Sequence, residues 1–152
     1  MTATAACYST RPYGYLGHDS NATVVIYRKA DVNLGAVAAF VAIDDQGVAE
    51  LHNDQYVEIH LAPGVHQLKL NGTGYQRPDV LAVEVADLER RFFEVKPNPA
   101  NLAAATASAV DPTPLGTMAT LLFTRPFLFD WREERDFRTL ADRLERTELP
   151  IR

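Results

Sequence analysis

The sequence predicts an all-β protein: an antiparallel β-sandwich of six to seven strands, followed by a C-terminal amphipathic helix. Short runs rich in valine, isoleucine, tyrosine and phenylalanine recur between residues 22 and 96. Turn-forming residues separate these runs at intervals of about 8–12 residues, which is typical of a sandwich or small barrel. The helical patterns that would connect the strands of a parallel sheet do not occur in this range.

Length and composition fit one domain with a hydrophobic core. The chain has 152 residues, of which 47% are hydrophobic and 23% charged, as in foldable globular proteins. Its net charge of -5 comes from 20 acidic and 15 basic residues that are interspersed, so no broad basic face is available for phosphates and we expect no nucleic-acid partner. No run approaches the roughly 18 apolar residues of a membrane-spanning helix.

The first predicted strands form around a tight turn. Residues 22–28 are a β-branched run that predicts a buried strand. Residues 36–43 form a second apolar run, and residues 48–51 are expected to return antiparallel to it. The four residues between them are turn formers, of which Gly47 is expected to adopt the positive φ.

A second hairpin is predicted around a proline and a glycine. The strand that ends at Leu61 alternates apolar and polar residues, which indicates one buried face. Pro63 and Gly64 fit the central positions of a type II turn. Because the alternation resumes at Leu68, this residue is expected to lie opposite either Ile59 or Leu61.

The remaining sequence completes the sandwich and adds a tail. Residues 79–85 and 91–95 are the last predicted strands. From Trp131 onward, apolar residues recur at spacings of three and four, which predicts a helix that packs on the sandwich. We therefore expect an extended leader over 1–21, the sandwich over 22–96, and an Ala/Pro-rich connection, aromatic segment and helix over 97–152.

No motif for catalysis or cofactor binding is found. The sequence lacks a phosphate-binding glycine loop, a cysteine pair, a His-Glu-x-x-His motif and a Gly-x-Ser-x-Gly motif. The four histidines are scattered, and the aspartates near residue 45 are expected to form turns. We expect no catalytic residues, no metal site and no cofactor, and therefore no enzyme.

Two groups of aromatic residues are candidate binding sites. The late aromatic run is either core or an exposed patch that contacts a partner; its candidate partner-binding residues are Phe127, Phe129 and Trp131. Tyrosines on loops or on a sheet face are the candidates for binding a carbohydrate or small ligand: Tyr13, Tyr56 and Tyr75.

The single cysteine, Cys7, follows Ala5 and Ala6, an arrangement that resembles the end of a bacterial lipoprotein signal. A basic region and an apolar region of 7–15 residues would precede the cysteine in such a signal, and neither precedes Cys7 here. Either the sequence begins just before a processing site and Cys7 is lipidated, or Cys7 is a free thiol.

The strand pattern over 22–28, 48–51 and 56–68 resembles a bacterial domain-of-unknown-function family of small lipoproteins with a prealbumin-like or immunoglobulin-like sandwich. The stretch 61–75, with its Pro-Gly and Gly-Tyr pairs, is also similar to surface-layer and carboxypeptidase-associated β-sandwich modules. The resemblance covers residues 22–96 and implies a fold and an envelope address without a family activity.

From these features we expect a non-catalytic envelope lipoprotein that acts as a structural or protein-interaction module. Its partner would be an envelope protein or a cell-wall component, and a lipid on Cys7 would attach it to a membrane from the periplasm. The outer membrane is preferred because Tyr8 stands where inner-membrane retention uses aspartate in the families that the chain resembles. A carbohydrate- or small-ligand-binding module is the alternative.

Overall fold

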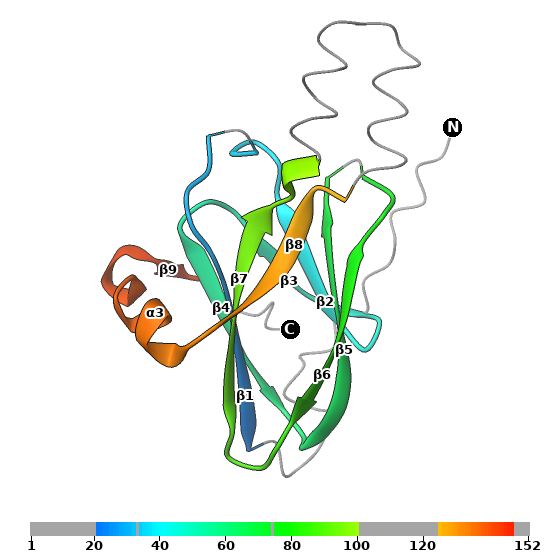
Figure 1. Cartoon of the computed structure of the whole chain (residues 1–152), viewed down its shortest axis with the longest axis vertical. Helices are drawn as coiled ribbons and strands as arrows, with labels where there is room; N and C mark the ends of the chain where they lie inside the picture. Colours follow the sequence, from blue (N-terminus) through cyan, green and yellow to red (C-terminus); the bar gives the residue numbers. More distant parts are fainter. Residues whose placement is uncertain (1–20, 33, 74, 101–124, 148–152) are drawn as a thin grey trace, which may run out of the picture.

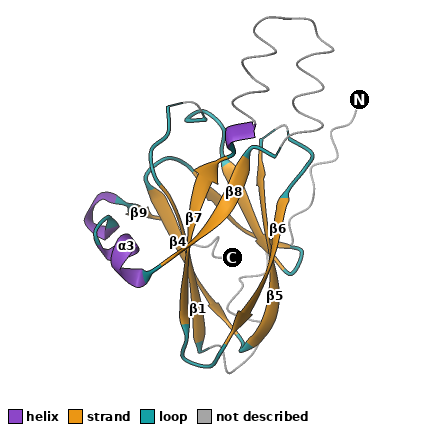
Figure 2. Cartoon of the chain, in the orientation of Figure 1, coloured by secondary structure: helices purple, strands orange, loops and turns teal. Residues whose placement is uncertain are grey.

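The computed structural model describes residues 21–32, 34–73, 75–100 and 125–147, and within them the protein is an all-β sandwich (Figures 1 and 2). This confirms the predicted fold class, with nine strands in the described residues where six to seven were expected. The strands are β1 (Ala22–Arg28), β2 (Ala39–Ile43), β3 (Gln46–Leu51), β4 (Gln55–Leu61), β5 (Gly64–Gly72), β6 (Asp79–Val85), β7 (Arg90–Pro97), β8 (Phe127–Arg132) and β9 (Glu145–Arg146).

The strands form two sheets. The five-stranded sheet has the order β8-β7-β1-β4-β9 and the four-stranded sheet the order β3-β2-β5-β6. Most neighbours are antiparallel, but β1 runs parallel to β7 at the centre of the five-stranded sheet. The main core fills the space between the sheets, where every second residue of each strand points inward.

Strand β1 is buried on both faces. Its residues Val24 and Ile26 point into the core between the sheets, whereas Val25 and Tyr27 point to the outer face of the five-stranded sheet. The chain after β8 covers this outer face through Phe137 and lies on the far side of the sheet from the core (Figure 1). Burial on two sides explains why residues 24–27 are continuously apolar instead of alternating.

The first predicted hairpin is confirmed, but its turn differs from the expectation. β2 and β3 are antiparallel, with Ile43 opposite Gln46, so the loop has only two residues. Asp44 and Asp45 adopt positive φ values of 48° and 65°, as a type I′ turn requires. The expectation that Gly47 takes the positive φ is wrong, because Gly47 already pairs within β3.

The second predicted hairpin does not form. β4 belongs to the five-stranded sheet and pairs with β1, whereas β5 belongs to the four-stranded sheet and pairs with β2 and β6. The turn around Pro63 carries the chain from one sheet to the other, and Gly64 follows with a φ of 141°. Alternation identifies the face that a strand buries, but both sheets bury a face against the same core, so it does not identify the neighbouring strand.

The predicted C-terminal helix is short and starts later than expected. Trp131 lies in β8, which pairs with β7, so the five-stranded sheet extends beyond residue 96. The helix α3 covers only Glu134–Arg138, and a 3₁₀ turn, η2, follows at Ala141–Arg143. At the start of α3, the Glu133 N–H donates a hydrogen bond of 3.3 Å to the Asp136 carboxylate. The apolar periodicity still serves to bury Phe137 and Leu144 against the sheet.

Candidate functional site

The three aromatic residues of β8 occupy different environments along one side of the strand. Phe127 is fully buried and its ring lies 4.6 Å from the guanidinium carbon of Arg28. Phe129 is half-buried and contacts Phe93 edge-on, with 6.0 Å between ring centroids. Trp131 is 55% exposed. Of the predicted partner-binding residues, therefore, only Trp131 offers a large accessible surface.

The last residue of β1, Arg28, is a buried arginine that the sequence did not single out as a candidate. Arg28 donates hydrogen bonds to the carbonyl oxygens of Leu34 at 2.6 Å, Val37 at 2.6 Å and Leu51 at 3.1 Å. Burial lowers the pKa of Arg28, and the charge of Asp31 partly opposes this shift. The guanidinium thereby holds the connection between β1 and β2 in place.

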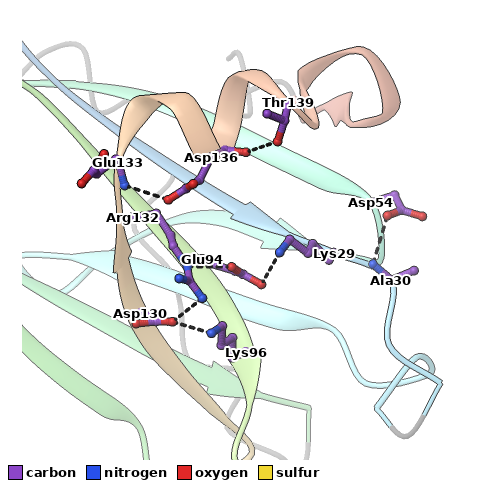
Figure 3. A network of polar contacts seen from close by, with 10 residues as sticks. All are labelled: Lys29, Ala30, Asp54, Glu94, Lys96, Asp130, Arg132, Glu133, Asp136 and Thr139. Atoms are coloured by element: carbon purple, nitrogen blue, oxygen red, sulfur yellow. Dashed lines mark hydrogen bonds and ion pairs between the residues drawn. The ribbon is translucent and has the colours of Figure 1, made fainter.

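On the outer face of the five-stranded sheet, charged side chains form a continuous network (Figure 3). Glu94 of β7 lies at its centre and is only 4% exposed. One carboxylate oxygen of Glu94 is 3.1 Å from the Lys29 ammonium, and the other accepts a hydrogen bond of 3.0 Å from Arg132. The buried carboxylate is thus compensated by cations on both sides.

The network continues to β8. The Asp130 carboxylate lies 2.5 Å from the Lys96 ammonium and 2.7 Å from the Arg132 guanidinium. The hydrogen bond from Lys96 lowers the pKa of Asp130, and burial opposes that shift. Burial acts to lower the pKa of Arg132, but the charges of Asp130 and Glu94 outweigh this effect and raise it. These alternating charges connect β7 and β8 and form a polar surface beside α3.

Tyr27 lies beside this network but takes no hydrogen bond from it. The residue is fully buried under Phe137, and its hydroxyl has no hydrogen-bond partner in the part of the chain that the structure describes. Burial raises the pKa of this phenol, and the charge of Glu94 raises it further. Tyr27 is therefore a neutral packing residue at neutral pH.

The predicted tyrosine site is not assembled among the described residues. Tyr56 packs edge-on against Phe137, with 5.2 Å between ring centroids, on the outer face of the five-stranded sheet. Tyr75 lies in the connection between β5 and β6, and its carbonyl accepts a hydrogen bond from Asn71. The two side chains belong to different layers of the sandwich. Tyr13 and Cys7 lie outside the described residues.

A small depression lies on the outer face of the four-stranded sheet. Its volume is about 200 Å³, below the roughly 300–1,000 Å³ of typical small-molecule sites. An ion pair between Asp45 and Lys69 lies at its rim. The lining residues are Phe40, Ala42, Asp45, Lys69, Asn71 and Pro78.

Metal-binding and membrane-spanning features are also lacking in the described ranges. There, no group of three or more histidine, cysteine, aspartate or glutamate side chains is placed to hold a metal ion. No helix among these residues is long and apolar enough to cross a membrane.

Comparison with known proteins does not assign the chain to a family: no model of a protein family matches it, and no curated protein matches it in sequence.

Proposed function

We propose that this chain is a non-catalytic protein-interaction module of a bacterial envelope lipoprotein, which uses the end of β8 to bind a partner. The partner is an envelope protein or a cell-wall component, and a lipid on Cys7 attaches the module to the outer membrane from the periplasm. This proposed location is supported by the resemblance of residues 22–96 to small lipoproteins and by the Ala-Ala-Cys sequence at residues 5–7.

The observation that carries the interaction role is the exposure of Trp131. Tryptophan is enriched in protein interfaces and often contributes a large part of the binding free energy. Trp131 remains 55% exposed although Phe127 on the same strand is fully buried.

The carbohydrate-binding alternative has less support. Tyr56 is used in packing against Phe137, and Tyr75 lies in the other layer. No described surface brings these two tyrosines together as a platform for a sugar ring.

The interaction role is tested by site-specific photo-crosslinking in the native cells. A photoreactive amino acid replaces Trp131, and Val32, which is 97% exposed, serves as the matched control position. We expect a discrete crosslinked adduct from position 131 that is missing from position 32. No adduct at position 131, or the same pattern at both positions, would show that the end of β8 does not bind a partner.

The proposed location in the bacterial envelope is tested separately, by mass spectrometry of the protein from its own cells. A diacylglyceryl group on Cys7 is the expected result. An unmodified Cys7 within a longer N-terminal region would contradict the lipoprotein assignment and leave the result at position 131 to be interpreted on its own.

A further inference from the structure

We propose that two copies of this chain associate through β6, so that their four-stranded sheets join into one continuous sheet across a two-fold axis. β6 is an edge strand of seven residues, Asp79–Val85, whose neighbour on one side is β5. In the described ranges, no strand pairs with its other side. This inference concerns a different surface from Trp131 and does not depend on the proposed function.

The hydrogen-bonding direction of the β6 backbone follows from its neighbour β5. The N–H of Gln67 donates to the Asp44 carboxylate at 2.9 Å, and its carbonyl accepts from the Asp44 N–H at 3.0 Å. Both groups therefore point toward β2 and away from β6. Since Ala82 lies opposite Gln67, its own N–H and carbonyl point outward, as do those of Val80 and Glu84 on the alternating pattern of an antiparallel pair.

The other edges carry features that block strand addition. On β8, the N–H of Phe129 already donates to the Asp79 carboxylate at 3.0 Å. On β3, a register shift opposite Val41 makes the strand irregular, and bulges of this kind disfavour edge pairing. On β4, β9 pairs with Gln55 and Tyr56, and the ionisable residues Glu58 and His60 follow on the outer face.

On the β6 edge, only the Asp79 end has such a contact within the described residues, the hydrogen bond from the Phe129 N–H. In the described ranges, the strand from Val80 to Val85 has no feature of this kind. Between Asp79 and Val85 there is no proline and no lysine, the residues that most often prevent edge pairing. The outward positions carry two small apolar residues and one acid, and Val80 is 46% exposed. On the adjacent strand Val65, which lies opposite Glu84, is exposed as well. A long, apolar and regular edge is the type that pairs with another strand.

A second copy of the same strand fits this edge without placing like charges opposite each other. If the two-fold axis passes beside Ala82, this residue lies opposite its own copy and Val80 lies opposite Glu84 of the second copy. No two like charges then face each other, as a two-fold interface requires for stability. The side chains of paired strands stand perpendicular to the sheet, so they do not prevent the two backbones from approaching to the normal strand spacing.

Replacement of Ala82 by proline tests the interface. Proline removes the outward N–H but no bond to β5, and it is tolerated on the open side of an edge strand. Sedimentation velocity of the full chain is expected to give a wild-type species of twice the 16.9 kDa chain mass and a monomer for Ala82→Pro. A monomeric wild type at all accessible concentrations, or a dimeric Ala82→Pro protein, would overturn the proposal.

A disulfide tests the pairing and its register without destabilising the strand. In a Cys7→Ser background, the Ala82→Cys variant places two sulfurs across the axis, where Cα atoms of a bonded antiparallel pair are about 5.5 Å apart and a disulfide can form. In the matched Val80→Cys control the two positions are offset by four residues, about 13 Å along the strands. Oxidation should link Ala82→Cys into a covalent dimer and leave Val80→Cys monomeric on a non-reducing gel. Failure of Ala82→Cys to cross-link, or equal cross-linking of both variants, would refute this interface.

Discussion

The buried Arg28 should be the polar side chain that contributes most to stability, and the change Arg28→Met tests this. Methionine keeps most of the apolar stem but donates no hydrogen bond, so three carbonyl oxygens lose the bond from the guanidinium. The Leu34 oxygen keeps a second bond, from the Val37 N–H at 3.0 Å, so only the Val37 and Leu51 oxygens lose their side-chain donor without this backbone replacement. A buried carbonyl left unpaired costs about 1–3 kcal/mol. Val37 is only partly buried, so its carbonyl can regain water and falls at the low end of that range, whereas the carbonyl of Leu51 cannot.

The sum is about 2–4 kcal/mol by this reasoning, and the relief of arginine desolvation reduces it to a net loss of about 1–3 kcal/mol. For a chain of this length, a loss of about 2 kcal/mol lowers the melting temperature by about 4–8 °C. The assay is urea denaturation of the wild type, Arg28→Met, and the control Arg138→Met, whose exposed ion pair is expected to contribute less than about 1 kcal/mol. A free energy of unfolding for Arg28→Met within about 0.5 kcal/mol of wild type would refute the reasoning, because the three bonds would then make no net contribution.

Two further predictions concern the outer face of the five-stranded sheet. Phe137→Ala removes the ring that contacts Tyr27 and two other aromatic residues, and should lower the free energy of unfolding by about 3 kcal/mol in the same assay; an unchanged value would mean that α3 is not part of the cooperative unit. Asp130 has a lowered pKa in the folded state because Lys96 donates a hydrogen bond to it, so its stabilising contribution is present above the unfolded pKa of about 3.9 and is lost as the pH falls through the lower folded value. Asp130→Asn should therefore be less stable than wild type at neutral pH, by at most about 1 kcal/mol because the side chain is partly exposed, and the two denaturation curves should converge in acid. A difference that grows as the pH falls would contradict this assignment.

The candidate site shows that sequence patterns do not predict how deeply an individual side chain is buried. The run of aromatic residues in β8 identified a notable strand, yet it did not distinguish the fully buried Phe127 from the exposed Trp131. Both point to the same side of the strand, and their exposure depends on how far the opposite sheet extends beside them. Glu94 could not be recognised from the sequence, because a single acid in a short strand looks like a solvent-exposed residue until its two cationic partners are placed.

The sequence by itself determined the fold class, the positions of the main turns and the apolar faces of the strands. These properties depend on local spacing: turn formers at fixed intervals, β-branched runs and alternation with a period of two. Only the tertiary structure decided which strand pairs with which. β4 and β5 follow each other in the chain but lie in different sheets, and the strand partners of β1 come from segments about 30 and 67 residues away. Pairing at such distances is set by how well the two sheets and α3 cover each other's apolar faces, a property of the assembled layers that no local pattern encodes.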